Sequence, residues 1–313
     1  MAGGDDSMGV RVAVIGAGYL GRHHARVFSE IEEAELVGVV DVDRDRAGEI
    51  ARLYGCRAFT DFREVFPHVD AVSIVTPTSV HHDIAMNSLR AGKDILVEKP
   101  LTPTVEEAEE LIAEADRTGR IIQVGHLERF NPAVLYVEGR IERPKFFEAE
   151  RLSPFQGRGT DVDVTLDLMI HDIDIILSLC RSPVTDVRAV GARVLTGRLD
   201  AVKAWLEMEN GTKALVTASR VSTEKRRVLK VFQDSGYMML DYQDLEIQTH
   251  RRTPAGAIAR EDIRLDYREP LKEELRDFAL CVMDGREPRV TARDGLEALK
   301  VAIEINGKIE ETI

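Results

Sequence analysis

A glycine-rich segment near the start of the chain constrains the fold most. It follows the apolar run Val10–Ile15, precedes a helical stretch from about Tyr19 to Phe28, and reads Gly16-Ala17-Gly18-Tyr19-Leu20-Gly21. In this G-x-G-x-x-G pattern one glycine permits a tight turn, one lets backbone amides approach a pyrophosphate, and one lets helix and strand pack closely. Alone, the pattern also occurs in ordinary glycine-rich turns between a strand and a helix.

An acidic residue in register with this loop favours dinucleotide binding. Asp41 follows the second apolar run, Leu36–Val40, and lies 20 residues beyond Gly21. A carboxylate at this place accepts hydrogen bonds from the adenosine ribose and repels a 2′-phosphate. The pattern therefore predicts NAD. NADP is the alternative, because Arg44 and Arg46 lie close by.

The first 124 residues alternate short apolar runs with helical stretches. Such a βαβαβ pattern predicts a parallel sheet covered by helices on both faces. Further strands are expected at Ala71–Val75, Ile95–Val97 and Ile121–Val124, and further helices at Arg44–Tyr54, Ser79–Arg90 and Thr104–Arg117. Thr104 and Glu107 form a capping box at the start of the last of these helices. We therefore expect a Rossmann dinucleotide-binding domain over residues 1–124.

The pattern changes after Gly125, so residues 125–313 predict a second domain. It is of the α+β class, with a large, mainly antiparallel open sheet. The expected order is a helix from Pro132, a strand at Lys145–Glu150, a glycine-containing loop at Gln156–Thr160 and an apolar helix at about Val164–Leu179. Strands follow from Val184 to about Gln248, with Asn210-Gly211 as a hairpin turn between Ala201–Glu209 and Thr212–Arg220. Two helices, near Leu271–Asp284 and Asp294–Lys308, are expected after them.

Composition excludes several classes of protein. The formal net charge of −13 argues against a nucleic-acid partner, because phosphate binding needs clustered Lys and Arg. No apolar run of about 18 residues predicts a membrane helix, and the first eight residues have the composition of a disordered leader rather than a signal peptide. The three cysteines, Cys56, Cys180 and Cys281, are far apart and odd in number, so reduced thiols and a cytoplasmic protein are expected.

Further motifs follow the glycine loop in order. They are Thr76-Pro77-Thr78-Ser79-Val80-His81, Glu98-Lys99-Pro100, Gly125-His126-Leu127-Glu128-Arg129-Phe130-Asn131-Pro132 and Asp167-Leu168-Met169-Ile170-His171. With these motifs nearly the whole chain resembles the glucose-fructose oxidoreductase, inositol dehydrogenase and rhizopine-catabolism (Gfo/Idh/MocA) oxidoreductase family. The resemblance implies hydride transfer at a carbohydrate or polyol carbon, and a homodimer or homotetramer formed through the second domain's sheet. It implies cofactor contacts at Gly16, Gly18, Tyr19, Leu20, Gly21, Asp41, Thr76, Pro77, His81, Glu98 and Lys99. A helix-start role is the alternative for His81.

Lys99 is the first candidate catalytic residue. It follows the apolar run Ile95–Val97, so it is expected at the carboxyl edge of the parallel sheet, where open α/β sheets bind ligands. An isolated lysine at a strand end is usually only solvated, but the Glu98-Lys99-Pro100 motif favours a functional residue. For the His23-His24 pair, in contrast, we expect a partly exposed position on the first helix.

The apolar helix near residue 164 supplies the other candidates. Asp167, His171, Asp174 and Ser178 follow i, i+4, i+7 and i+11, so they share one helix face, which must meet water or a polar cavity. The resemblance places Asp167 and His171 beside Lys99. We expect His171 to be the general base, Asp167 to orient it or bind substrate hydroxyls, and Lys99 to stabilise the alkoxide. Lys99 as the base is the alternative. A zinc site is not expected, because no third ligand has suitable spacing.

The substrate class depends on the segment around Arg129. Arg129 is suited to an anionic substrate group, with a structural ion pair as the alternative, and His126 is a second candidate for substrate contact. This segment, with Asp167–Asp174, resembles the branch of the family that oxidises C3 of UDP-N-acetylglucosamine. A free-sugar or inositol dehydrogenase is the alternative enzyme. A non-catalytic NAD-binding regulator is the alternative of another class, although it would not need Lys99, Asp167 and His171.

Overall fold

The computed structural model describes residues 9–157 and 162–312, which form two compact units. The first unit contains residues up to Leu127 together with Glu269–Leu296, and the second contains Glu128–Arg268 and the residues from Glu297 onward. The expected leader at residues 1–8 lies outside the described residues, as does most of the expected loop Gln156–Thr160.

The first unit is a Rossmann fold, as predicted. Its strands are β1 (Val10–Ile15), β2 (Ala34–Val40), β3 (Arg57–Phe59), β4 (Ala71–Ile74), β5 (Asp94–Glu98) and β6 (Ile122–Gly125). Its helices before residue 127 are α1 (Tyr19–Glu30), α2 (Arg44–Tyr54), α3 (His81–Arg90) and α4 (Val105–Thr118), with short 3₁₀ turns η1 (Phe62–Glu64), η2 (Phe66–His68) and η3 (Thr78–Val80). Strand β3 was not predicted, since three residues carry too little periodicity to distinguish a strand from a loop.

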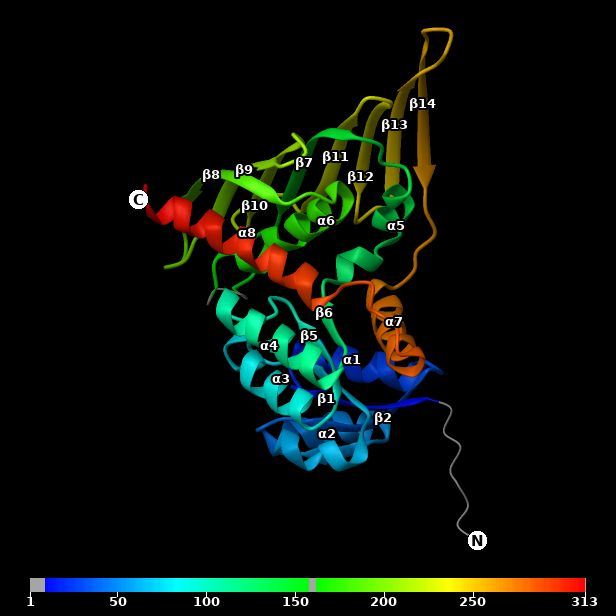
Figure 1. Cartoon of the computed structure of the whole chain (residues 1–313), viewed down its shortest axis with the longest axis vertical. Helices are drawn as coiled ribbons and strands as arrows, with labels where there is room; N and C mark the ends of the chain where they lie inside the picture. Colours follow the sequence, from blue (N-terminus) through cyan, green and yellow to red (C-terminus); the bar gives the residue numbers. More distant parts are fainter. Residues whose placement is uncertain (1–8, 158–161, 313) are drawn as a thin grey trace. The chain divides into compact units, whose positions relative to one another are not determined.

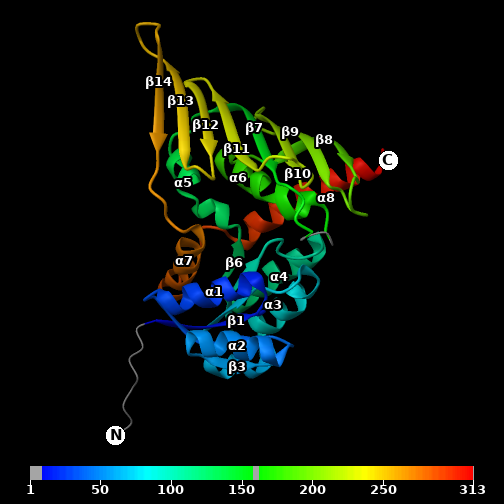
Figure 2. The same ribbon diagram turned by 180° about the vertical axis from the view of Figure 1, so that it is seen from behind.

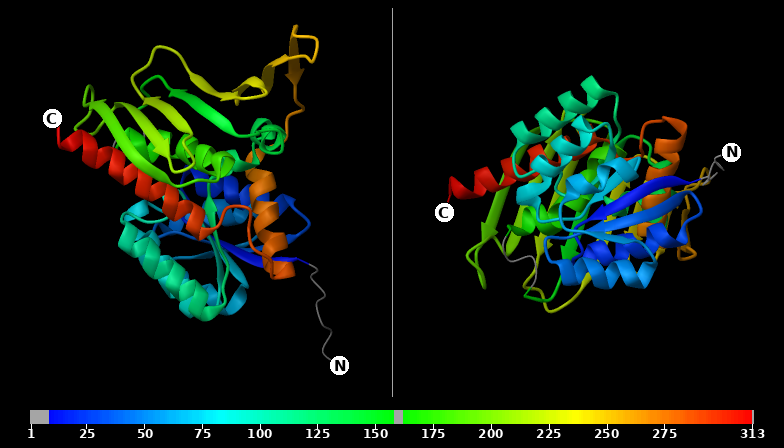
Figure 3. Two further views of the ribbon diagram at one scale, coloured as in Figure 1. Left: turned by 45° about the horizontal axis from the view of Figure 1, so that its top comes forward. Right: turned by 90° about the horizontal axis from the view of Figure 1, so that it is seen from below.

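All strand pairs of the first sheet are parallel, in the order β3-β2-β1-β4-β5-β6. Strands β2 and β3 extend the sheet on one side of β1, whereas β4, β5 and β6 extend it on the other side. The carboxyl ends of β1 and β4 are therefore the topological switch point at which such sheets bind ligands. Helices lie on both faces of the sheet, with α1 and α2 on one side and α3 and α4 on the other (Figure 3, right).

Local signals fix where these helices begin and end. Asp43 accepts hydrogen bonds from the backbone N–H groups of Asp45 and Arg46 at the start of α2, which ends at Gly55 in the left-handed conformation (φ 70°). Thr104 caps α4 by accepting the N–H of Glu107 at 3.3 Å, which confirms the predicted helix start. The carboxyl edge of the sheet is thereby held in a fixed arrangement.

Helix α7 (Pro270–Asp284) corrects the predicted domain division. We expected one continuous second domain over residues 125–313, but α7 belongs to the first unit. Leu275 and Phe278 of α7 share a buried cluster with Val12 of β1 and Phe28 of α1. The sequence does not reveal this grouping, because an apolar helix face does not show which surface it covers.

The second unit contains an eight-stranded sheet in the order β14-β13-β12-β11-β7-β10-β9-β8. Its strands are β7 (Pro144–Leu152), β8 (Val184–Ala192), β9 (Ala201–Met208), β10 (Lys213–Ser219), β11 (Arg226–Gln233), β12 (Gly236–Asp241), β13 (Glu246–Arg252) and β14 (Ile258–Arg264). Among the neighbouring strands of the described sheet only β7 and β10 are parallel, which confirms a mainly antiparallel sheet. Strands continue beyond the predicted limit at Gln248. The prediction ended too early because β13 and β14 are rich in polar residues.

Helices cover one face of this sheet (Figure 1). They are α5 (Pro132–Glu138), α6 (Ile170–Cys180) and the second-unit part of α8 (Ala292–Glu310), and the short turn η4 (Leu127–Phe130) precedes α5. Phe147 of β7, Ile173 of α6 and Ile305 of α8 belong to one buried cluster. The predicted helix Val164–Leu179 is interrupted, since Thr165–Met169 forms a π-helical turn, η5, before α6 begins.

The opposite face of this sheet carries a row of aromatic side chains. Neighbouring rings lie 5.0–5.8 Å apart, centroid to centroid, along the series Trp205, Phe146, Phe232, Tyr237 and His250. The helices α5, α6 and α8 lie on the other face of the sheet, and the strands lie in front in the rear view (Figure 2). The sheet is therefore open on one side, as predicted.

Candidate active site

The three glycines of the loop after β1 have different surroundings. Gly16 has φ +107°, and a Cβ atom there would lie 2.2 Å from the carbonyl oxygen of Val75. A Cβ at Gly21 would lie 1.8 Å from the carbonyl oxygen of Gly16, so the turn and the helix need both glycines. A Cβ at Gly18 would meet nothing within 4 Å. The fold does not require a glycine at position 18, which points to space reserved for a ligand.

Asp41 lies against this loop. Its Oδ2 atom accepts a hydrogen bond from the N–H of Ala17 at 2.8 Å, and its Oδ1 atom accepts one from the N–H of Asp43 at 2.9 Å. Arg46 Nη1 lies 3.8 Å from Asp41 Oδ2. The carboxylate is thus fixed beside the backbone amides of the glycine loop.

The other predicted cofactor residues of this edge include two exposed apolar side chains. Tyr19 and Leu20 are 69% and 47% exposed at the start of α1. Thr76 and Pro77 follow β4, the neighbour of β1 at the switch point. The Thr76 Oγ1 atom is buried and has no hydrogen-bond partner among the described residues. An open cradle at Gly18 and an unpartnered hydroxyl across the switch point fit a dinucleotide.

His81 matches the helix-start alternative, because α3 begins at this residue. It is 1% exposed, with Nδ1 3.0 Å from the carbonyl oxygen of Pro100 and Nε2 2.9 Å from that of Thr76. Burial lowers the pKa of His81, against the raising effect of both carbonyls. Because both ring nitrogens face backbone oxygens, the ring joins the loops that carry Thr76 and Lys99, and its contact with a cofactor stays a prediction.

Glu98 and Lys99 end β5 at the same edge of the sheet. Glu98 is buried, its Oε2 atom accepts the N–H of Lys99 at 3.2 Å, and its Oε1 atom lies 3.1 Å from His24 Nε2. The expectation of a partly exposed His23-His24 pair was wrong for His24, which is 0% exposed. The signal was the helical spacing of Gly21, His24 and Phe28, which gives them one buried face.

The candidates of the second unit lie around η5 and α6. Asp167 lies within the π turn and is half-buried, and His171 is 8% exposed on the first turn of α6. π turns inside helices are frequent at functional sites. The predicted polar stripe is more buried than expected, because Asp174 is 2% exposed and forms an ion pair with Arg129.

Arg129 and His126 are both buried. Arg129 Nη1 lies 3.3 Å from Asp174 Oδ1, which matches the structural alternative stated for this arginine. His126 is 1% exposed, in the first unit. Contact of either side chain with a substrate stays a prediction.

Sequence reasoning missed a buried charge network in the second unit. Arg151, on β7, binds Asp172 through Nε and Nη2 at 2.8 and 3.0 Å and binds Glu128 through Nη1 at 2.9 Å. Arg227 Nη1 lies 3.3 Å from the same Glu128 oxygen. Burial acts to raise the pKa of Glu128, but the two arginines hold it below its usual value. Asp172 adjoins His171, so the network anchors the start of α6.

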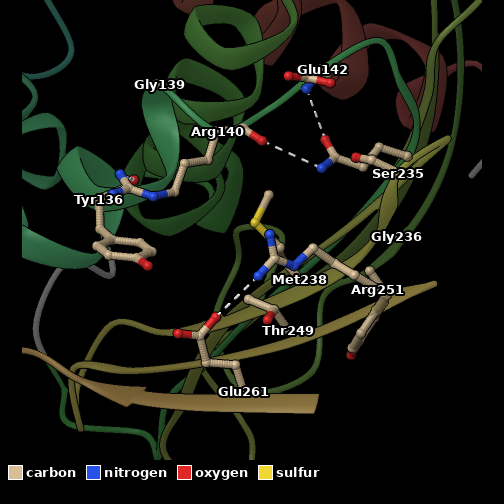
Figure 4. Close-up of a pocket in the computed structure, with 12 residues that line it drawn as sticks. Tyr136, Gly139, Arg140, Glu142, Ser235, Gly236, Met238, Thr249, Arg251 and Glu261 are labelled. Carbon is tan, nitrogen blue, oxygen red and sulfur yellow. Dashed lines mark hydrogen bonds and ion pairs between the residues drawn. The ribbon is translucent and has the colours of Figure 1, made fainter. Parts of the chain in front are cut away.

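A pocket of about 450 Å³ also lies in the second unit (Figure 4). Its lining includes Met238 and Thr249. Two hydrogen bonds join other lining residues: Gln233 Nε2 donates to the carbonyl oxygen of Arg140, and Arg251 Nη2 donates to Glu261 Oε2 at 3.4 Å. None of the predicted site residues lines this pocket. Within residues 9–157 and 162–312, no group of three or more His, Cys, Asp or Glu side chains is arranged to hold a metal ion. No helix in that part of the chain is long and apolar enough to cross a membrane.

Comparison with known proteins gives the same assignment over most of the chain. Residues 10–126 match the model of an oxidoreductase family with an NAD-binding Rossmann fold, and residues 133–239 match the GFO/IDH/MocA C-terminal domain. The chain is 37% identical to UDP-N-acetylglucosamine 3-dehydrogenase of Acidithiobacillus ferrooxidans, over 96% of this chain and 97% of the relative. It is 32% identical to scyllo-inositol 2-dehydrogenase (NAD(+)) of Bacillus subtilis, over 94% and 92% of the two chains.

A solved structure of the Acidithiobacillus ferrooxidans dehydrogenase superposes with a TM-score of 0.92, covering 96% of this chain and 98% of that one. The two family models together cover more than half of the chain. The first matched range contains the glycine loop and the Glu98-Lys99 pair, and the second contains most strands of the open sheet. The chain is therefore a dehydrogenase of the Gfo/Idh/MocA oxidoreductase family, with an NAD-binding Rossmann domain.

Proposed function

We propose that this enzyme oxidises the C3 hydroxyl of UDP-N-acetylglucosamine with NAD. The observation that carries the proposal is the 37% identity, over nearly the full length of both chains, to a dehydrogenase named for that reaction. A free-sugar or inositol dehydrogenase is the second candidate, favoured by the 32% identity to a scyllo-inositol 2-dehydrogenase.

The cofactor is held by the carboxyl edge of the first sheet. Bound NAD supplies the acceptor for the hydride that leaves the alcohol carbon. The amides at Gly18 and the start of α1 bind the pyrophosphate, because free N–H groups and the helix dipole favour negative charge. Asp41 accepts the adenosine ribose hydroxyls, and its charge favours NAD over NADP.

Lys99, Asp167 and His171 act on the substrate in this proposal. His171 takes the hydroxyl proton as the carbon–hydrogen bond breaks and the carbonyl forms, since an imidazole can both accept and return a proton near neutral pH. Asp167 orients the imidazole or a substrate hydroxyl. The Lys99 ammonium stabilises the developing alkoxide, and Lys99 as the base is the alternative assignment.

The open sheet face supports a homodimer or homotetramer. The aromatic row from Trp205 to His250 lies on this face, and aromatic side chains are enriched at protein interfaces. Light scattering after size-exclusion chromatography would report a multimer for the purified protein. A Phe232→Glu variant of the same fold is expected to run at a lower mass.

The thiols support a cytoplasmic location. Cys180 and Cys281 are buried and Cys56 is half-buried, and none of the three forms a disulfide in the described chain. Burial raises the pKa of Cys56 to about 11, so this thiol resists oxidation. We place the enzyme in the cytoplasm, where reduced thiols persist.

A substrate panel tests the function. Purified protein with NAD is given UDP-N-acetylglucosamine, myo-inositol, scyllo-inositol and free hexoses, and NADH absorbance is followed. NADH formation with the nucleotide sugar, abolished in a Lys99→Ala variant that still binds NAD, is the expected result. Formation only with an inositol selects the second candidate. Tight NAD binding without any reduction would instead indicate the non-catalytic regulator.

A further inference from the structure

We propose that His24 and Glu98 are positioning residues for Lys99. In this proposal the Nε2–H group of His24 donates a hydrogen bond to Glu98, and this bond holds the carboxylate that fixes the Lys99 backbone. The inference rests on the proposed function, because it assumes that Lys99 acts in the reaction. It adds His24, a fully buried residue of helix α1, to the site.

One carboxylate connects helix α1 to the backbone of Lys99. Glu98 Oε1 lies 3.1 Å from His24 Nε2, while Glu98 Oε2 accepts the N–H of Lys99 at 3.2 Å. On the other side of the imidazole, His24 Nδ1 lies 2.9 Å from Ser73 Oγ on β4. Three elements, α1, β4 and β5, thus meet at the point where the Lys99 side chain begins.

The negative charge of Glu98 strengthens its hydrogen bond with His24. Burial acts to raise the pKa of Glu98, but the hydrogen bond with His24, together with Lys99, holds it below its usual value. The Glu98 charge also acts to raise the pKa of His81, on α3, although burial lowers it overall. Hydrogen bonds to an ionised group are shorter and roughly twice as strong as neutral ones, so His24 fixes the carboxylate more firmly than packing alone.

The Ser73–His24–Glu98 arrangement resembles the order of a hydrolytic triad. In such triads the serine hydroxyl is exposed to the acyl group that it attacks. Ser73 and His24 are both 0% exposed, so no substrate can reach the hydroxyl. A serine that donates to His24 Nδ1 instead keeps the proton on Nε2, facing Glu98. The arrangement therefore acts through the carboxylate, toward Lys99.

Two neighbours complete the restraint on Lys99. A Cβ atom at Gly125 would lie 2.9 Å from Glu98 Cδ and 3.0 Å from Oε1, so the carboxylate fits between α1 and β6 only because residue 125 has no side chain. His81 Nδ1 lies 3.0 Å from the carbonyl oxygen of Pro100, the residue after Lys99. The backbone is held on both sides of the lysine.

Two substitutions at one position separate positioning from packing. Gln places a donor nitrogen where His24 has Nε2, whereas Asn places its amide where His24 has Nδ1 and cannot reach Glu98. We expect His24→Gln to keep kcat within about threefold and His24→Asn to lower it about 30-fold, since a misplacement of about 1 Å can cost about 100-fold. NAD affinity, measured by calorimetry, should change less than threefold in both variants, which corresponds to less than about 0.7 kcal/mol. The primary deuterium isotope effect on kcat should rise only in His24→Asn.

Controls make each outcome decisive. His68→Asn, at a half-buried histidine of η2 outside the network, should behave as wild type. Equal losses of kcat in His24→Gln and His24→Asn, or an unchanged isotope effect in His24→Asn, would overturn the positioning role. If His24→Asn does not fold, Glu98→Gln gives the test from the other partner, with a kcat loss of about tenfold expected and no loss contradicting the proposal.

The two proposals fail in different ways. A wild-type protein that oxidises no sugar removes the proposed function, and the positioning role with it. A wild-type protein that oxidises a sugar, while its His24 variants show no difference between donor and non-donor side chains, removes the positioning role alone.

Discussion

Asp41 Oδ2 accepts a hydrogen bond from the backbone N–H of Ala17 at 2.8 Å, which ties the residue after β2 to the glycine loop after β1. The same carboxylate that is proposed to select the ribose thus also shapes the loop that is proposed to hold the pyrophosphate. Its charge and its acceptor oxygen have separate effects, and substitutions can distinguish them.

An Asp41→Asn variant should keep the loop but relax the choice of cofactor. The amide oxygen can still accept the Ala17 N–H and only the bond from the Asp43 N–H is lost, while the charge that repels a 2′-phosphate is gone. The ratio of NADP to NAD affinity is expected to rise about tenfold, roughly 1.4 kcal/mol, by calorimetry. Asp61→Asn, at a surface 3₁₀ cap, serves as the control. An unchanged ratio would show that Asp41 does not select the ribose.

Gly18 and Gly21 should respond oppositely to alanine. A Cβ at Gly18 meets open space, so Gly18→Ala should unfold at the wild-type urea midpoint yet bind NAD at least about tenfold more weakly. A Cβ at Gly21 overlaps the Gly16 carbonyl, so Gly21→Ala should lose about 1–3 kcal/mol of unfolding free energy or more. Normal NAD affinity in Gly18→Ala would place the dinucleotide elsewhere.

Arg151 is expected to be among the residues most costly to replace. Arg151→Met leaves Asp172 and Glu128 buried without their shared cation, which typically costs about 3–5 kcal/mol of unfolding free energy. Arg251→Gln, which breaks an exposed pair with Glu261, should cost at most about 1 kcal/mol. Urea unfolding followed by circular dichroism measures both, and similar losses in the two variants would contradict the account of the network.

Asp200 should make the fold sensitive to acid. The backbone N–H groups of residues 194–196 and the Thr196 hydroxyl bind its buried carboxylate. Although burial acts to raise the pKa of Asp200, these hydrogen bonds lower it from 3.8 to about 2. Because the pKa is lower in the folded state, the contribution of about 2 kcal/mol is present above pH 4 and is lost as the pH falls toward 2.

A pH series of urea unfolding checks this contribution. Asp200→Asn should be less stable than wild type at pH 6 and should lose less stability than wild type between pH 4 and pH 2. Asp186→Asn, at a half-buried position of β8, should follow the wild-type curve. Parallel curves for wild type and Asp200→Asn would disprove the contribution.

Much of the fold was predictable because it depends on local patterns. Asp43 and Thr104 mark helix starts through their own side chains, and the alternation of apolar runs gives the parallel sheet. The placement of α7 was not predictable, since Leu275 and Phe278 show an apolar face without its partner surface. Strand β14 escaped for the opposite reason: its residues are mostly charged and exposed, with little apolar alternation.

The candidate site was predictable where a motif carried it and hidden where partners come from distant strands. The glycine loop and the Glu98-Lys99 pair follow from sequence motifs. Arg151 and Asp172 are 21 residues apart, and neither shows in sequence that its charge is neutralised inside the protein. A charged residue in a strand is ordinarily read as solvent-facing, so buried ion pairs are found only when the strand is seen in its sheet.

Gly125 carries no functional group, yet its missing side chain decides where the charge of a neighbouring strand can rest. A saturation mutagenesis screen that scores turnover should therefore mark this position as intolerant even to alanine, while a map of ligand contacts would leave it blank. Engineering of the sugar specificity of this enzyme should therefore leave Gly125, at the end of β6, unchanged.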